Sequence, residues 1–150
     1  ENSPFESVRT NGKGYLLTSK RRVDYMALYR SSDEDLQNPY YAPLLSKDLS
    51  RQPRTLIITA EYDPLRDEGE AYGQKLADFG NAVEIHRIHD ALHGFMSLSP
   101  GFKHVKKAYR YINHFLAEQP TDFGEVISET EEAKAELTEQ SDKEVNSLEK

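Results

Sequence analysis

The 150-residue sequence contains no cysteine. A chain without cysteine can form neither a disulfide framework nor a reactive thiolate, and it fits a reducing cytoplasm, which is the location we expect. No apolar run approaches the roughly 18 residues that a membrane span requires, and no signal peptide is visible. No basic patch stands out, so we do not expect nucleic acid as a partner.

Negative charge is concentrated at one end of the chain. The net charge is -7, and residues 119–150 alone hold ten carboxylates and three lysines, so residues 1–118 balance to zero. The acidity therefore says nothing about what the globular part binds. Because residues 119–150 have few large apolar side chains, we expect a disordered tail or a marginal, solvated helix there. A protein-binding role for this tail stays open.

The first third of the chain has weak patterns. Residues 1–17 carry turn signals and predict a loop. Apolar residues three apart predict a helix over residues 19–30, which Thr18 or Ser19 can cap. Residues 31–53 are polar and interrupted by prolines, which indicates an ordered connection.

The pattern then alternates between strand and helix. Residues 55–60 form a short, continuous β-prone run, typical of a strand covered on both faces. A helix opens near Pro64 and closes at Gly80, a second strand covers residues 82–89, and an apolar stripe predicts a helix over residues 102–118. This βαβα order predicts a parallel sheet with helices on its faces. Two strands cannot complete such a sheet, and the sequence offers no others, so we expect part of a larger fold.

Two residues that can carry chemistry follow the two predicted strands. Asp63 comes three residues after Ala60, and His93 follows the second strand. Sites in open α/β sheets gather beyond the carboxyl ends of the strands, so the two side chains can meet there. A carboxylate bonded to an imidazole fixes its tautomer and stabilises the imidazolium that forms when it takes a proton.

Four stretches together resemble the hormone-sensitive-lipase-like branch of the α/β-hydrolases. They are residues 61–69 (Glu-Tyr-Asp-Pro-Leu-Arg-Asp-Glu-Gly), 93–95 (His-Gly-Phe), 14–18 (Gly-Tyr-Leu-Leu-Thr) and 38–45 (Asn-Pro-Tyr-Tyr-Ala-Pro-Leu-Leu). The resemblance covers about residues 12–118, in order and without large gaps. Each motif is weak by itself, but their joint spacing is specific.

This resemblance implies the C-terminal portion of an α/β-hydrolase sheet with flanking helices. Residues 1–53 would be a connection and cap-side helix, residues 54–118 the core part carrying acid and base, and residues 119–150 the acidic tail. It further implies a serine esterase acting on small or medium acyl esters, without a cofactor, in which Asp63 is the triad acid and His93 the general base. The resemblance also implies a homo-oligomer of the whole enzyme, because the last strand and its helix often form a dimer interface in this family.

The family's nucleophile is missing from the sequence. Such enzymes use a Gly-x-Ser-x-Gly elbow and a His-Gly-Gly-Gly-type oxyanion loop, and neither occurs here. The chain order of this fold, serine before acid before histidine, predicts that both lie upstream of Glu1, in an N-terminal half that would be the partner of this chain. Ser97 and Ser99 have no elbow and follow the histidine, so neither is expected to be the nucleophile.

Other interpretations of the same residues stay open. Asp63 before Pro64 is also a common helix opening, and Asp67 fits helix-end electrostatics or loop support better than the triad. His86, His89 and His93 suggest zinc, but a strand end followed by a loop gives the wrong geometry, so no metal is expected.

Aromatic residues and the function of the whole chain also leave alternatives. Tyr40, Tyr41 and Phe95 could line a substrate pocket or belong to the core. Without its serine, the chain could instead be a non-catalytic protein-interaction module or an inactive piece of an esterase.

Overall fold

The computed structural model describes residues 3–117 and 126–128 and is built around two parallel strands. β1 (Thr55–Tyr62) pairs with β2 (Val83–Leu92), with Thr55 opposite Val83, and α3 (Arg66–Asp78) connects them. The expected parallel βαβ unit is therefore confirmed. Both strands run further than predicted, β1 by two residues and β2 by three, because the pairing resumes after a register shift with Tyr62 opposite Leu92.

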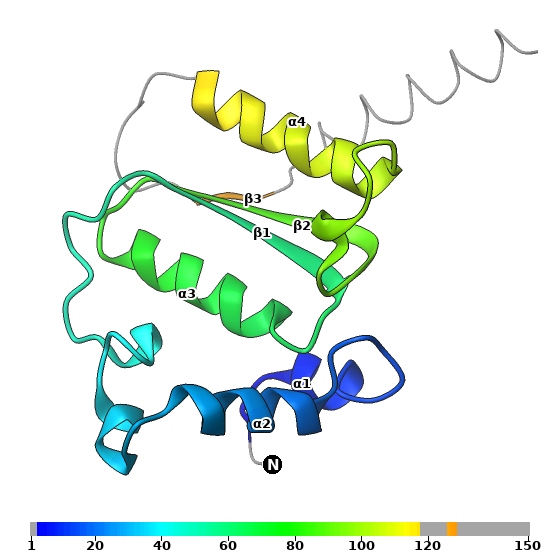
Figure 1. Cartoon of the computed structure of the whole chain (residues 1–150). Helices are drawn as coiled ribbons and strands as arrows, with labels where there is room; N and C mark the ends of the chain where they lie inside the picture. The colour runs from blue at the N-terminus through cyan, green and yellow to red at the C-terminus, as the bar shows by residue number, and fades with distance from the viewer. Residues whose placement is uncertain (1–2, 118–125, 129–150) are drawn as a thin grey trace, which may run out of the picture.

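Helices cover both faces of the sheet. α3 packs on one face and α4 (Lys103–Ala117) on the other, as Figure 1 shows. Each interface has its own hydrophobic cluster. The cluster on the α3 side contains Leu49, Leu76, Ala77 and Val83, and the one on the α4 side contains Ala60, Ile88, Ala91, Phe95, Val105 and Ala108. This two-sided burial explains why the β1 sequence is a continuous apolar run rather than an alternating one.

Local chemistry sets the ends of α3 and its close approach to the sheet. Pro64 lies in the turn that opens the helix, and Gly80, with a φ of 82°, follows its end in the left-handed region that glycine tolerates. At Gly73 a β-carbon would come within 2.7 Å of Ile85 Cδ1 and 2.9 Å of Ile57 Cδ1. Glycine there lets the helix lie close on the sheet.

The N-terminal third differs from the expected loop. Residues 6–10 form a short helix, α1 (Glu6–Thr10), which buries Ser7 and Val8, so the prediction of a loop over residues 1–17 is wrong at this point. Its packing comes from contacts with residues far along the chain, which local sequence patterns do not reveal. α2 (Ser19–Tyr29) confirms the next helix, and Thr18 caps it by accepting a hydrogen bond from Arg21 N.

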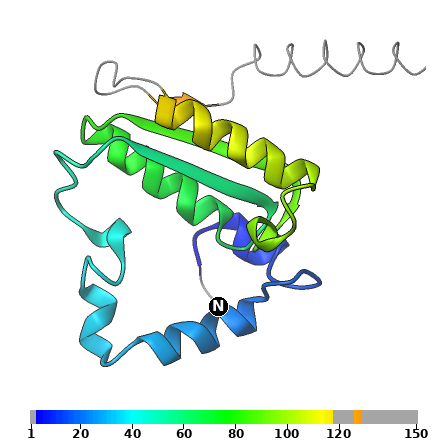
Figure 2. The ribbon, with the colours of Figure 1, turned by 45° about the horizontal axis from the view of Figure 1, so that its top comes forward.

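α2 buries none of its residues. It lies beyond α3 from the sheet, as Figures 1 and 2 show. Two short 3₁₀ turns, η1 (Asp33–Gln37) and η2 (Pro43–Leu45), follow in the connection. The apolar side chains of α2 are exposed, as expected of a helix that contributes to no core within the described residues.

A third strand corrects the prediction that the chain offers only two. β3 (Val126–Ser128) pairs in parallel with β2, so the sheet order is β1-β2-β3. The 3₁₀ turn η3 (Phe95–Ser97) leads from β2 toward α4. The remainder of the predicted acidic tail lies outside the described residues. None of the helices within residues 3–117 is long and apolar enough to cross a membrane.

Candidate functional site

The structure brings Asp63 and His93 together at the carboxyl ends of β1 and β2. His93 Nδ1 lies 2.7 Å from Asp63 Oδ2, a hydrogen bond that requires the imidazole to carry its proton on Nδ1. The Asp63 side chain is 14% exposed and that of His93 38% exposed. Within the described residues His93 Nε2 has no hydrogen-bond partner. The bond to Asp63 thus fixes the tautomer of the imidazole and leaves the lone pair of His93 Nε2 available as a base.

Asp63 uses its two oxygens for two tasks. Oδ1 accepts a hydrogen bond of 2.8 Å from the backbone N–H of Leu65, and Oδ2 faces His93. The interpretation of Asp63 as a residue that opens the helix is therefore compatible with its pairing to histidine. The turn made through Oδ1 also fixes the side-chain rotamer that aims Oδ2 at the imidazole.

The backbone before His93 is held by Glu61. Asp90 has a φ of 58°, and its N–H donates a hydrogen bond of 2.8 Å to Glu61 Oε2. This bond is the main cause of a lowered pKa of the Glu61 carboxyl, against an opposing effect of burial and with support from His89. Gly94, with a φ of 76°, then turns the chain directly after the histidine. His93 therefore stands on a tightly bent segment.

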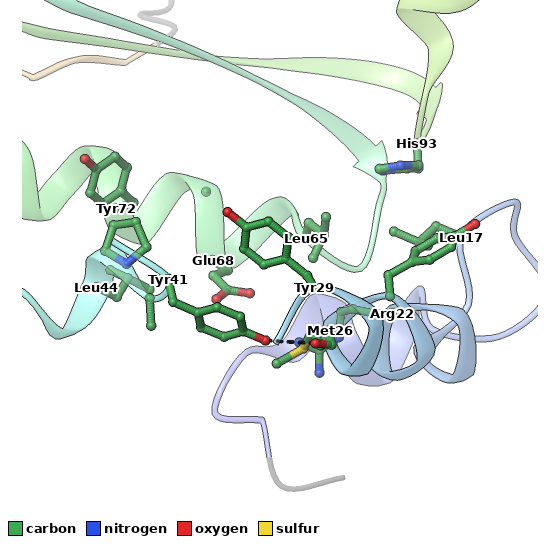
Figure 3. Close-up of a pocket in the computed structure, with 14 residues that line it drawn as sticks. Leu17, Arg22, Met26, Tyr29, Tyr41, Leu44, Leu65, Glu68, Tyr72 and His93 are labelled. Carbon is green, nitrogen blue, oxygen red and sulfur yellow. Dashed lines mark hydrogen bonds between the residues drawn. The ribbon is translucent and has the colours of Figure 1, made fainter. Parts of the chain in front are cut away.

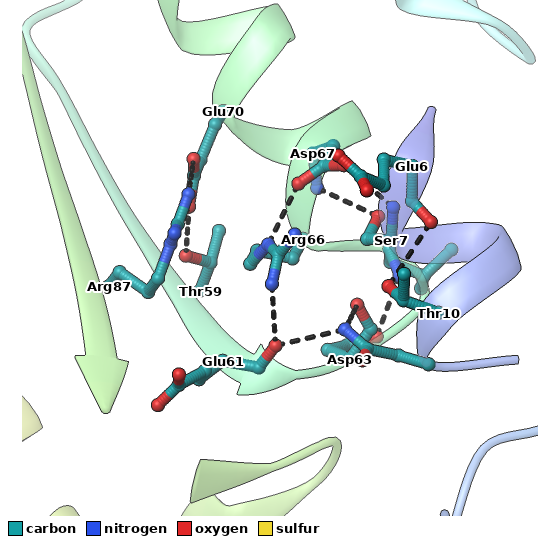
Figure 4. A network of polar contacts seen from close by, with 12 residues as sticks. Glu6, Ser7, Thr10, Thr59, Glu61, Asp63, Arg66, Asp67, Glu70 and Arg87 are labelled. Atoms are coloured by element: carbon teal, nitrogen blue, oxygen red, sulfur yellow. Dashed lines mark hydrogen bonds and ion pairs between the residues drawn. The ribbon is translucent and has the colours of Figure 1, made fainter. Parts of the chain in front are cut away.

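A polar network fastens α1 to the segment that carries Asp63 (Figure 4). Ser7 N donates to Asp67 Oδ2 at 2.7 Å, Ser7 Oγ donates to the Pro64 carbonyl at 3.0 Å, and Asp67 N donates to Ser7 Oγ at 3.2 Å. Asn11 Nδ2 donates to the carbonyl oxygens of Glu61 and Asp63, at 3.0 and 3.3 Å. Sequence reasoning missed both Ser7 of α1 and Asn11, which follows the helix, since Asn11 before Gly12 reads only as a turn signal.

Asp67 belongs to this network and has no contact with His93 among the described hydrogen bonds. Burial raises its pKa, but hydrogen bonds from Arg66 and Ser7 together outweigh that effect, so the pKa lies below its ordinary value. Arg66 Nε is 2.7 Å from Asp67 Oδ1, and Arg66 Nη1 donates to the Glu61 carbonyl. The placement agrees with the expected role of Asp67 in supporting the loop.

A cavity of about 580 Å³ opens beside His93, as Figure 3 shows. Its walls come from α2, the segment 41–44 and the first turns of α3. They are mostly apolar and aromatic, formed by Leu17, Tyr25, Met26, Tyr29, Tyr41, Ala42, Pro43, Leu44, Leu65, Gly69 and Tyr72, together with the basic and acidic side chains of Arg22, Glu68 and His93. Such a cavity can hold an apolar group beside the imidazole.

The three aromatic residues left undecided by sequence have three different positions. Tyr41 lines the cavity and donates a hydrogen bond to the Met26 carbonyl. Phe95 is buried in the cluster under α4. Tyr40 is 96% exposed and belongs to neither. Local sequence could not separate these cases, because an aromatic ring suits a core and a substrate pocket alike.

The alternative nucleophiles and metal ligands are dispersed. The Ser97 hydroxyl donates to the Gly94 carbonyl, and Ser99 Oγ accepts from Gly101 N. His86 stacks on the Tyr111 ring, and His89 Nδ1 lies 3.5 Å from Glu61. Within the described residues, no group of three or more histidine or acidic side chains is placed to hold a metal ion.

Comparison with known families identifies the fold. The model of a family described by its α/β-hydrolase fold matches residues 1–97 of the sequence. The chain belongs to this α/β-hydrolase family. The match includes Asp63 and His93 and the segments from α1 to η3.

Curated relatives of this α/β-hydrolase chain are esterases and related hydrolases. It is 40% identical over 92 residues to an arylesterase of Saccharolobus solfataricus, covering 61% of this chain and 30% of the relative. It is 43% identical over 89 residues to the carboxylic ester hydrolase LipN of Mycobacterium tuberculosis, covering 58% of this chain and 23% of the relative. It also matches mouse hormone-sensitive lipase at 30% identity over 95 residues, covering 62% of this chain and 12% of the relative.

Solved structures give the same result. The thermostable carboxylesterase EstE1, from a metagenomic library, superimposes with a TM-score of 0.70 at 31% identity, covering 79% of this hydrolase chain and 42% of EstE1. The esterase of Pyrobaculum calidifontis gives a TM-score of 0.69 at 34% identity, covering 75% of this chain and 37% of that esterase. The matched part of the chain thus spans between 12% and 42% of the length of these relatives.

Proposed function

We propose that this chain supplies the acid and base of a serine carboxylesterase. His93 is the general base and Asp63 the residue that orients it. The observation that carries the proposal is the bond of 2.7 Å between His93 Nδ1 and Asp63 Oδ2 at the rim of an apolar cavity. Resemblance to esterases over the same segment supports it.

The chemistry follows from the tautomer. With the proton on Nδ1, the lone pair of His93 Nε2 can take the proton of a serine hydroxyl as that oxygen attacks the ester carbonyl. Asp63 stabilises the imidazolium that results. The imidazolium then protonates the departing alcohol, and a second round, with water in place of serine, releases the acid. The serine and the oxyanion donors would come from a preceding N-terminal portion of the hydrolase, since the chain order of this fold puts them before the acid.

The cavity favours esters with an apolar group of small or medium size. Its tyrosine and aliphatic lining can bury such a group next to His93, while the charged groups Arg22 and Glu68 lie on its walls. We propose acyl esters as the substrate class for this reason. A cytoplasmic location and a homo-oligomeric assembly stay predictions.

A fluorophosphonate probe tests the proposal. Fluorophosphonates react with a serine only when its hydroxyl is activated, so intact masses after treatment identify the polypeptide that carries the nucleophile. We expect an adduct on a serine in a Gly-x-Ser-x-Gly elbow, in the polypeptide or complex that contains this chain, and its loss in the His93→Ala variant. An exposed-residue variant, His114→Ala, is the matched control and should label normally.

Two results would count against the proposal. An adduct that persists in His93→Ala would assign the base to another residue. No adduct in any preparation of the natural protein would favour the alternative of a non-catalytic interaction module with esterase ancestry.

A further inference from the structure

The segment that carries Asp63 is anchored from outside the sheet, by α1. Ser7 is fully buried and Asn11 is 5% exposed, yet both are polar. Within the described residues, α1 contributes to neither hydrophobic cluster. Burying polar side chains without partners is costly, so their location has to be explained by the hydrogen bonds that they make.

Those hydrogen bonds converge on residues 61–67. Asn11 Nδ2 donates to the carbonyl oxygens of Glu61 and Asp63, at 3.0 and 3.3 Å, and so bridges the C-terminal end of β1. Ser7 bonds to the Pro64 carbonyl and exchanges two hydrogen bonds with Asp67. Three backbone carbonyls around the acid are thus fixed by two side chains that lie 50 to 57 residues earlier in the sequence.

We propose that Asn11 and Ser7 are positioning residues that hold Asp63 in the geometry needed to bond His93. The inference rests on the proposed function for its catalytic meaning, but the bond itself exists without turnover. Only two side-chain torsions separate the Asp63 backbone from Oδ2. A shift of the backbone by a fraction of an ångström would therefore pass directly into the 2.7 Å contact with His93.

Nuclear magnetic resonance of the full chain, labelled with ¹⁵N-histidine, tests the inference. A proton held between His93 Nδ1 and the Asp63 carboxylate should give a downfield resonance that exchanges slowly with water. Asn11→Asp keeps the size and shape of the side chain but removes both N–H donors, and Ser7→Ala removes only a hydroxyl. We expect each variant to speed this exchange roughly tenfold, the change that corresponds to losing one or two hydrogen bonds.

Two controls separate positioning from general stability. Thr10→Ala removes a hydroxyl from the same helix, where it bonds, among the residues that the structure describes, only to the Glu6 carbonyl. Leu76→Ala weakens the core under α3, away from the acid. Both should leave the His93 resonance unchanged. In the polypeptide or complex that hydrolyses esters, Asn11→Asp should lower kcat with KM unchanged.

The outcomes decide the inference. A His93 resonance that is unaltered in folded Asn11→Asp and Ser7→Ala proteins would overturn it. So would a resonance that Leu76→Ala disturbs equally, or its absence from the unsubstituted chain. A third outcome separates the two proposals. If the His93 resonance is present and exchanges faster in both variants, but no fluorophosphonate labels the protein, the proposed function is overturned and the positioning role stands.

Discussion

At the scale of single residues, Asp63 combines a local and a distant partner. One oxygen closes a turn on Leu65 N and the other reaches a histidine that lies 30 residues later. The local bond is what a sequence pattern of aspartate before proline predicts. The distant bond is what gives the residue its proposed chemistry. The same side chain serves both because a carboxylate accepts hydrogen bonds at each oxygen independently.

Replacing Asp63 by asparagine should remove catalysis while preserving the turn. Asparagine can still accept from Leu65 N, but its amide would face His93 Nδ1 and favour the opposite tautomer. If the proposed esterase function holds, we expect kcat for a p-nitrophenyl ester to fall by about 10⁴-fold in the polypeptide or complex that hydrolyses it. Asp78→Asn, on the exposed end of α3, is the control. A loss below about tenfold would show that Asp63 is not the residue that orients the base.

The Asp67 carboxyl should make the attachment of α1 sensitive to acid. Its pKa is lower in the folded chain than its ordinary value of 3.8, because the hydrogen bonds from Arg66 and Ser7 outweigh burial. Folding therefore favours the charged form of Asp67. The stabilisation of the folded chain by this carboxylate is complete above pH 3.8. It is lost as the pH falls from there through the lower pKa of the folded state. Exchange of the Ser7 amide, corrected for intrinsic rates, should accelerate in that window. Asp67→Asn should abolish the acid dependence, and a variant that keeps it would assign the effect to another carboxyl.

At the scale of elements, α3 links the sheet to the candidate site. Its first turn carries the contacts to α1, and its middle lies so close to the sheet that Gly73 has no room for a side chain. α3 therefore connects the close-packed face of the sheet with the residues that hold the Asp63 segment.

Gly73→Leu should destabilise the fold by forcing α3 away from Ile57 and Ile85. Overpacking of this kind costs about 1–3 kcal/mol, less any gain in helix propensity from replacing glycine. Gln74→Leu, at the exposed neighbouring position, introduces the same side chain and should change stability little. Urea unfolding measures both free energies. Equal stabilities for the two variants would mean that the helix is not held tightly against the sheet.

At the scale of the whole molecule, β1 has one paired and one unpaired edge. β2 occupies one side, and no strand within the described residues occupies the other. Backbone groups on alternate residues point to opposite edges of a strand. Thr55 N bonds toward β2, so Leu56 and Ile58 direct their N–H groups to the open edge. The partial coverage of longer relatives agrees with a sheet that continues there.

The chain in isolation should associate through this edge. We expect sedimentation velocity to give a species heavier than the 17.2 kDa monomer, increasing with concentration. Leu56→Pro deletes an edge N–H without removing a bond to β2, and it should shift the distribution toward monomer. Leu56→Ala loses the same side chain but keeps the N–H, so it should associate like the unsubstituted chain. If both variants behave alike, exposed apolar surface rather than the strand edge drives association.

The sequence by itself determined the parallel βαβα order, a helix predicted over residues 19–30 and observed over 19–29, and the placement of Asp63 and His93 at one edge of the sheet. These depend on local periodicity, on turn residues such as Gly80, and on the rule that neighbouring parallel strands end at the same edge. Only the tertiary structure decided that residues 6–10 are helical, that β3 joins the sheet, and that Tyr41 lines the cavity while Phe95 lies in the core. The physical reason is that these features depend on contacts between residues far apart in the chain. Ser7 and Asn11 look like ordinary loop residues until residues 61–67 fold against them.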